Sequence, residues 1–362
     1  MKKLAKGILA MLVLAIALSA CRPPEIEGVV MDMGNNANEN ALVKAEAATK
    51  KYPDNPEAWF YLGYLNGEHS KDYAKMNEAF DKALALNPAQ VVTMPDGSTV
   101  QAKQAIDNYR GTLFASSFND GIKKLNAAQQ AEGDERTKLL SSAQMKMETA
   151  VSATPSRVET YHPLALVYLM QGDTAKVESA LNSGMEVGGE DEEFLTKAGS
   201  MLLQLGKTET AEPMFKKAMD LNPENGVNFQ MLGNLEANRK NWEKANDYYV
   251  QAIKLNPDDG DLAYNIGVGY YSQQKWADAI PYFTQALEAG LDEEQTYKIL
   301  GVCYVQADKN DEGMTFLENA VTIYPDNASL WEYLAIVYGK KQMGKKADAA
   351  YKKSQELEKM SN

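Results

Sequence analysis

Residues 226–259 read GVNFQMLGNLEANRKNWEKANDYYVQAIKLNPDD, and residues 260–293 read GDLAYNIGVGYYSQQKWADAIPYFTQALEAGLDE. The two stretches are equally long and place similar residues at the same positions, such as the tryptophans Trp242 and Trp276. The glycines continue this spacing of 34 residues in both directions, at Gly199, Gly233, Gly267 and Gly301. A fixed period of this length is typical of a protein built from structural repeats.

Each repeat contains two apolar patterns with the period of an α-helix. Tyr297, Leu300 and Tyr304 share one face of a first helix, helix A, because they are three or four residues apart. A second helix, helix B, repeats this spacing and ends before a proline such as Pro257, which cannot continue the hydrogen-bond ladder. A single hairpin cannot bury its own apolar face, so neighbouring hairpins are expected to stack into a solenoid.

The filled positions resemble the tetratricopeptide repeat, with its W-x2-L-G-x2-Y…A-x3-F…A-x4-P pattern. In one unit the matching residues are Leu232-Gly233, Ala245, Tyr249, Ala252 and Pro257. The resemblance implies an all-α fold, a right-handed superhelical solenoid of stacked antiparallel helix hairpins. We place this solenoid at 40–361, with units near 56–90, 102–157, 158–191, 192–225, 226–259, 260–293, 294–327 and 328–361.

Two of these units depart from the regular length. The unit at 56–90 has one extra residue between its helices, and the unit at 102–157 begins with a long helix over about 102–130. Between them, Pro95-Asp96-Gly97 lies among residues that favour strands, which predicts a small β-hairpin insertion near 91–100.

The N-terminal segment indicates export. Lys2, Lys3 and Lys6 precede a short apolar run, so residues 1–20 are expected to be a signal peptide. The ending Leu18-Ser19-Ala20-Cys21 resembles the lipobox of bacterial lipoproteins, which implies lipidation (palmitate) of Cys21. An ordinary secretory signal cut after Ala20 is the alternative.

Residues 21–39 contain prolines, glycines and asparagines, and we interpret them as a flexible tether. By resemblance to enterobacterial lipoproteins, Arg22 after the cysteine favours the outer membrane over the inner one. The predicted location is therefore the cell envelope, with the protein anchored by lipid to the outer membrane and facing the periplasm.

Composition excludes several classes of function. The formal charge of −13 argues against nucleic acid as a partner, because binding phosphates requires a basic surface. The two histidines, His69 and His162, are far apart, and Cys303 occupies an apolar position of its repeat. We therefore expect no catalytic residue, no metal and no cofactor, and an enzyme is not the predicted class.

The family resemblance places particular helix A positions on the inner, concave face of the solenoid. Amide and aromatic side chains dominate there, a composition suited to a peptide-recognition groove; the selected residues are Gln230, Asn234, Tyr264, Asn265, Tyr271, Lys298 and Tyr333. These positions could also be ordinary solvated helix surface. A clamp for a C-terminal carboxylate is not favoured, because Gln230, Gln295 and Ile299 stand where such clamps have basic residues.

These observations predict a lipid-anchored adaptor or scaffold that mediates protein–protein interaction in the cell envelope, in envelope assembly or secretion. Its partner would be a protein or peptide in the concave groove, and its membrane contact would be the lipid anchor. The alternative is a protein that binds cell-wall glycan or a small solute in the same groove.

Overall fold

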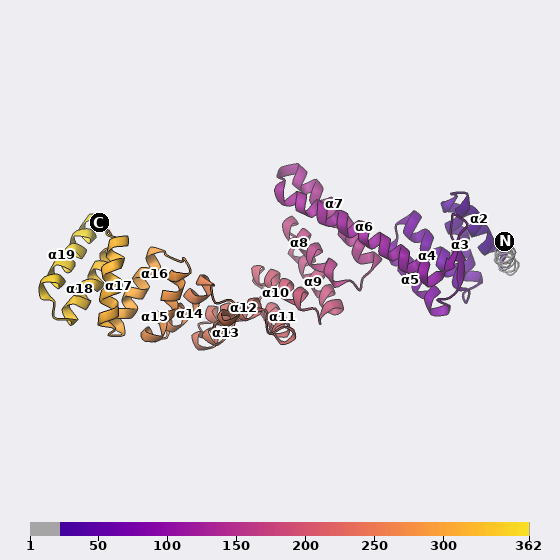
Figure 1. The fold of residues 1–362 in the computed structure, drawn as a ribbon. Coiled ribbons are helices and arrows are strands. Elements are labelled where there is room, and N and C mark those ends of the chain that lie inside the picture. The colour runs from indigo at the N-terminus through magenta and orange to yellow at the C-terminus, as the bar shows by residue number, and fades with distance from the viewer. Residues whose placement is uncertain (1–21, 362) are drawn as a thin grey trace, which may run out of the picture. The chain divides into compact units, whose positions relative to one another are not determined.

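The computed structural model describes residues 22–361, and most of them lie in α-helices. The chain divides into two compact units, the first ending at Gly188 and the second beginning at Gly189. Within each unit, consecutive helices pack against each other as pairs in chain order (Figure 1). The predicted all-α stack of helix hairpins is therefore confirmed.

The helices of both units come in pairs of A and B helices. In the first unit they are α2 (Pro24–Gly34), α3 (Asn38–Lys51), α4 (Pro56–Leu65), α5 (Tyr73–Leu86), α6 (Ala102–Gln130), α7 (Gly133–Ala153), α8 (Tyr161–Gln171) and α9 (Thr174–Gly188). In the second unit they are α10 (Glu192–Gln204), α11 (Thr208–Leu221), α12 (Gly226–Asn238), α13 (Trp242–Leu255), α14 (Gly260–Ser272), α15 (Trp276–Glu288), α16 (Glu294–Gln306), α17 (Asn310–Ile323), α18 (Ala328–Lys340) and α19 (Gly344–Ser361). The long first helix expected over 102–130 is α6.

Three of the four repeat glycines, Gly199, Gly233 and Gly267, lie where helix A meets an aromatic ring of helix B. A methyl group added to Gly233 would lie 2.5 Å from the ring of Tyr249, and one added to Gly267 would lie 2.8 Å from the ring of Phe283. Both rings are buried. At Gly233 and Gly267 a side chain would therefore occupy the space of the ring, so glycine allows the two helices to approach closely.

The tether predicted for residues 21–39 is wrong for most of that range. Residues 24–34 form α2, which packs against α3 and buries Ile26, Val29 and Met33 on one face. Pro24 occupies the first turn of α2, where a helix needs no backbone N–H donor and proline is tolerated. The helical hairpins therefore begin at Pro24 and not at residue 40.

The segment directly after Cys21 is held against the first unit. One guanidinium nitrogen of Arg22 lies 2.5 Å from the Glu57 carboxylate and 3.0 Å from the Thr93 hydroxyl, and the other lies 3.0 Å from the Glu27 carboxylate. The Arg22 side chain is only 11% exposed. Residues 1–21, with the predicted signal peptide and Cys21, lie outside the described residues.

The two irregular units are explained by local structure. The extra residue of the 56–90 unit is accommodated by η1 (Asn66–Ser70), a short π-helix that extends α4. The insertion that follows is an antiparallel hairpin of β1 (Val91–Thr93) and β2 (Thr99–Gln101), as predicted. A 3-10 turn, η2 (Val158–Thr160), precedes α8.

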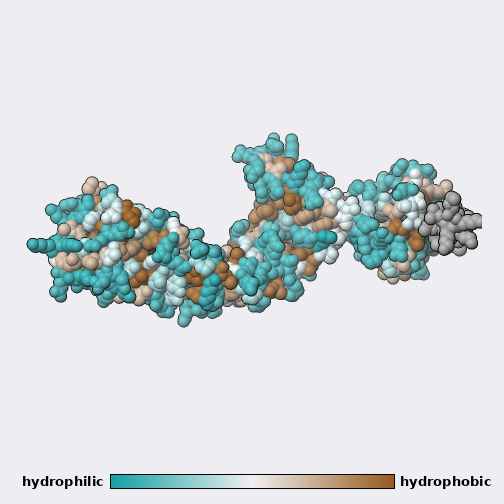
Figure 2. Space-filling view, viewed as in Figure 1, coloured by the Kyte–Doolittle hydropathy of each residue, from teal (hydrophilic) through white to brown (hydrophobic). Residues whose placement is uncertain are grey.

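The visible surface of the chain is mostly hydrophilic, with smaller apolar patches between polar areas (Figure 2). Among residues 22–361, no helix combines the length and hydrophobicity that crossing a bilayer requires.

Candidate functional site

The predicted groove residues lie on four A helices of the second unit. Gln230 and Asn234 are on α12; Tyr264, Asn265 and Tyr271 are on α14; Lys298 is on α16 and Tyr333 is on α18. All seven side chains are half-buried. They are thus neither core residues nor fully solvated, and part of each remains available to a ligand.

Several of these side chains also contribute to packing between helices. The Tyr249 hydroxyl donates a hydrogen bond to the Asn234 side-chain oxygen at 2.8 Å. Tyr264 contacts Phe283 edge to face, with ring centroids 5.4 Å apart, and Tyr271 contacts Trp276 in the same way at 5.0 Å. Tyr264 and Tyr271 are therefore held in position by the neighbouring B helix, α15.

Tyr264 and Tyr333 of this face have raised pKa values and are hydrogen-bond donors at neutral pH. Burial raises the pKa of Tyr264, and the negative charge of Glu293 raises it further. Burial also raises the pKa of Tyr333, with a smaller contribution from nearby Glu332 and Tyr271. Protonated phenols next to amides form a face that can both donate hydrogen bonds to a peptide backbone and accept them.

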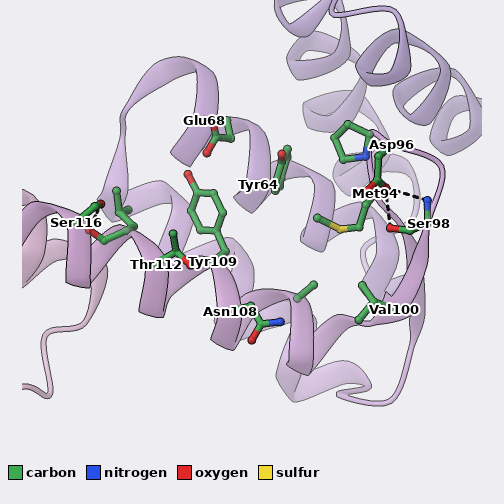
Figure 3. Close-up of a pocket in the computed structure, with 13 residues that line it drawn as sticks. Tyr64, Glu68, Met94, Asp96, Ser98, Val100, Asn108, Tyr109, Thr112 and Ser116 are labelled. Carbon is green, nitrogen blue, oxygen red and sulfur yellow. Dashed lines mark hydrogen bonds between the residues drawn. The ribbon is translucent and has the colours of Figure 1, made fainter.

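The first unit contains a second candidate site, a cavity that the sequence pattern does not predict. A cavity of about 720 Å³ lies between the end of α4, η1, the turn of the β-hairpin and α6. Tyr64 and Tyr109 line its interior, while Glu68 and Asp96 approach it from η1 and from the hairpin turn (Figure 3). The two irregularities found in the sequence, the extra residue and the Pro-Asp-Gly turn, supply these two carboxylates.

Local backbone structure sets the geometry of this cavity. The Tyr109 hydroxyl comes so close to η1 that a methyl group on Gly67 would lie 2.6 Å from it. The Tyr64 and Tyr109 rings are 5.5 Å apart, and the Tyr109 ring also contacts Phe80 edge to face. On the hairpin side, Asp96 accepts hydrogen bonds from the backbone and hydroxyl of Ser98 at 2.9 and 2.6 Å.

The electrostatic environment of the cavity is negative. Burial raises the pKa of Tyr109 far above its ordinary value, and the Glu68 carboxylate adds to this shift. The pKa of Tyr64 is also raised, again mainly by burial and then by Glu68 and Asp96. Phenolate formation is disfavoured at both rings because an added negative charge would be partly desolvated and close to carboxylates.

Cys303 is a core residue, as its apolar repeat position predicted. Its side chain is fully buried, and burial raises the pKa of the thiol to about 12. In residues 22–361, no group of three or more His, Cys, Asp or Glu side chains could hold a metal ion.

Repeated hairpins of an A and a B helix, with glycine against an aromatic ring, define a helical-repeat protein. A family model described as tetratricopeptide repeat matches residues 33–91, 231–290 and 264–328, and a second one with the same description matches residues 192–225. Together these matches span just over half of the chain. The chain belongs to the tetratricopeptide repeat family, whose fold is typical of protein–protein interaction scaffolds and whose members are generally not enzymes.

Solved structures with this type of fold are similar to the chain at low sequence identity. YrrB, described as a TPR protein with an unusual peptide-binding site, is 20% identical, with a TM-score of 0.44, over 49% of this chain and 92% of YrrB. PilF from Pseudomonas aeruginosa is 16% identical, with a TM-score of 0.46, over 62% of this chain and 98% of PilF. A tetratricopeptide repeat protein from Parabacteroides merdae is 16% identical, with a TM-score of 0.43, over 67% and 93% of the two chains. No curated protein matches the chain.

Proposed function

We propose that this protein is a lipid-anchored adaptor of the bacterial cell envelope, acting in envelope assembly or secretion. Cys21 carries the lipid, the protein faces the periplasm from the outer membrane, and a protein or peptide partner docks on the second unit. The observation that carries the proposal is the row of half-buried side chains on α12, α14, α16 and α18, which are amides and tyrosines apart from Lys298 on α16. We call this row the A-helix face.

The chemistry of the A-helix face favours an extended peptide segment as the ligand. Asn265 and Gln230 offer amides that can pair with backbone N–H and C=O groups, and Tyr264 and Tyr271 offer large, rigid contact areas. Lys298 is the one cation among the seven selected residues. A site with so little positive charge suits an internal segment of the partner better than a free C-terminal carboxylate.

The environment of Arg22 is consistent with an anchor close to the fold. Arg22 follows Cys21 directly, and its ion pairs with Glu57 and Glu27 hold the chain against the first unit. A lipid on Cys21 would therefore be one residue away from a fixed point of the first unit. In this proposal the first unit stays close to the bilayer, and the second unit carries the partner-binding face.

Site-specific photo-crosslinking in cells tests the partner face. A photoreactive amino acid replaces Tyr264, Asn265 or Tyr271 in turn, and Gln251 and Glu288, exposed on the B helices α13 and α15, are the matched control positions. We expect a discrete protein adduct from the A-helix positions only. Equal capture from both sets of positions, or none from either, would refute a partner site on this face.

The glycan alternative gives a different result in the same system. A protein that used these tyrosines to bind cell-wall glycan would form no protein adduct, and purified wall polymer would quench its tyrosine fluorescence. Quenching by wall polymer without a protein adduct would therefore favour glycan binding over the adaptor.

A further inference from the structure

We propose that the cavity beside the β-hairpin binds a positively charged group on an apolar stem, either an ammonium or a guanidinium. The cavity is lined by Tyr64, Tyr109, Glu68, Asp96 and their neighbours in the first unit. It lies apart in sequence from the A-helix face of the second unit. The proposal therefore does not depend on the partner-binding function proposed above.

Charge is the first reason for this ligand class. Glu68 and Asp96 reach the rim from different elements, η1 and the hairpin turn, and both are exposed (Figure 3). None of the thirteen residues that line the cavity, all of them in the described part of the chain, is Lys, Arg or His. A ligand with a positive charge would be attracted by both carboxylates, whereas an anion would be repelled.

The aromatic rings are the second reason. Tyr64 and Tyr109 are half-buried. Their ring centroids lie 5.5 Å apart and their ring planes are inclined at 58°, so the two rings line adjoining walls of the cavity. The faces of tyrosine rings attract ammonium and guanidinium groups. Rings flanked by carboxylates therefore favour a cation over a neutral group of the same shape.

The shape and the remaining lining residues specify the stem of the ligand. Met94, Val100, Ala105 and Leu113 contribute apolar surface below the acidic rim. Lysine and arginine side chains bury their methylene stems along such surfaces and keep the charged end near water. The volume of about 720 Å³ lies in the range of roughly 300–1,000 Å³ typical of ligand sites, which leaves room for a short peptide around the basic side chain.

Two sources could supply this group, a basic side chain of a peptide segment or a free aliphatic diamine. Calorimetric titration of the purified full chain distinguishes them. The probes are the capped tripeptide acetyl-Gly-Lys-Gly-amide, the same tripeptide with norleucine in place of lysine, and cadaverine. We expect the lysine tripeptide to bind about tenfold more tightly than the norleucine tripeptide, because both carboxylates contribute. This preference should shrink with added salt.

Variants assign the binding to this cavity. Glu68→Gln and Asp96→Asn should each weaken lysine-tripeptide binding about threefold, and the double variant about tenfold. Asparagine at position 96 retains an oxygen that can accept the Ser98 hydrogen bonds, so the hairpin turn should persist. Glu39→Gln, an exposed change in the first turn of α3, is the control and should leave the affinity unchanged. Circular dichroism confirms that each variant is folded.

The results of these titrations either support the cation site or overturn it. Binding of both cadaverine and the lysine tripeptide supports the site with a free amine as its ligand, and binding of the tripeptide alone supports it with a peptide segment. Equal binding of the norleucine and lysine tripeptides would overturn the proposal. So would unchanged affinity in the folded double variant, or no binding of either cationic probe at about 10 mM.

Discussion

Two helical glycines, Gly233 and Gly111, show how one residue type can have opposite effects at different positions. Gly233 lies against the Tyr249 ring, with room for no side chain, whereas a methyl group on Gly111 in α6 would meet nothing within 4 Å. We expect Gly233→Ala to lower the free energy of unfolding by about 1–3 kcal/mol, because the ring must move. Gly111→Ala should raise it by up to about 1 kcal/mol, because alanine favours helix. Urea unfolding followed by circular dichroism measures both.

The two variants serve as controls for each other. A stabilising effect of Gly233→Ala would show that the Tyr249 ring has space to shift, and the packing explanation of the glycine positions would then fail. The glycine positions themselves could be predicted from the sequence because they recur with the repeat. A close approach of the two helices at these small residues could be predicted as well, but the ring that fills the space could not, because it depends on the geometry of the folded hairpin.

At the scale of elements, ion pairs and amides connect consecutive hairpins. Glu212 on α11 lies 2.5 Å from Arg239, which follows α12, and 2.7 Å from Lys216. Hydrogen bonds from Arg239, and then from Lys216, lower the pKa of Glu212 to about 2 from an ordinary value of 4.5. Glu212 therefore stabilises the fold above pH 4.5, and this contribution is lost as the pH falls toward 2, because the unfolded chain binds the proton first.

Substitution of Glu212 should show this pH dependence. Both cations are more than one-third exposed, so we expect Glu212→Gln to cost at most about 1 kcal/mol at pH 7 and almost nothing near pH 2. Urea midpoints of both proteins across this pH range measure the difference. Glu209→Gln, on the same helix, changes the net charge equally and serves as the control. A cost that stays constant down to pH 2 would exclude the ion pairs as its source.

A second connection between hairpins repeats within the second unit. The Asn225 side chain donates to the Glu192 carboxylate at 2.7 Å, and Asn327 donates to Glu294 in the same way. Asn225 and Asn327 also cap the helices that follow them, α12 and α18. Taken alone, Glu192 is one of two acidic residues in the first turn of α10, where negative charge is favourable in any helix. The repeat spacing shared by the two Glu–Asn pairs is the signal that could have revealed this contact.

The N-terminal helix α2 is an element whose local sequence favours a loop although the segment folds as a helix. α2 has its apolar residues at helical spacing, but the prolines, glycines and asparagines around them are more typical of a loop. Burial against α3 and α4, together with the Arg22 ion pairs, outweighs this weak local preference. Tertiary packing of this kind cannot be read from a single segment.

At the scale of the whole molecule, the two candidate sites differ in how predictable they are. The positions of the A-helix face recur with the period, and the family resemblance implies that they share one face of the stacked helices. The acidic cavity does not, because its residues come from a helix end, a π-helix, a hairpin turn and a second helix. These parts lie outside the regular repeat, so only the folded first unit brings them together.

The anchor proposal concerns the whole molecule, because it determines where the first unit lies. The chain has two cysteines, and Cys303 is fully buried with the pKa of its thiol raised to about 12, so acylation there is not expected. Labelled palmitate fed to cells should therefore enter the wild-type protein and the Cys303→Ala variant equally, and Cys21→Ser should abolish the label. A label that persists in Cys21→Ser would contradict the anchor. A processed wild-type protein without label would instead support an ordinary secretory signal that is cut after Ala20. The ion pairs of Arg22 would then hold the N-terminal segment of the processed protein against the first unit, without fixing that unit near a membrane.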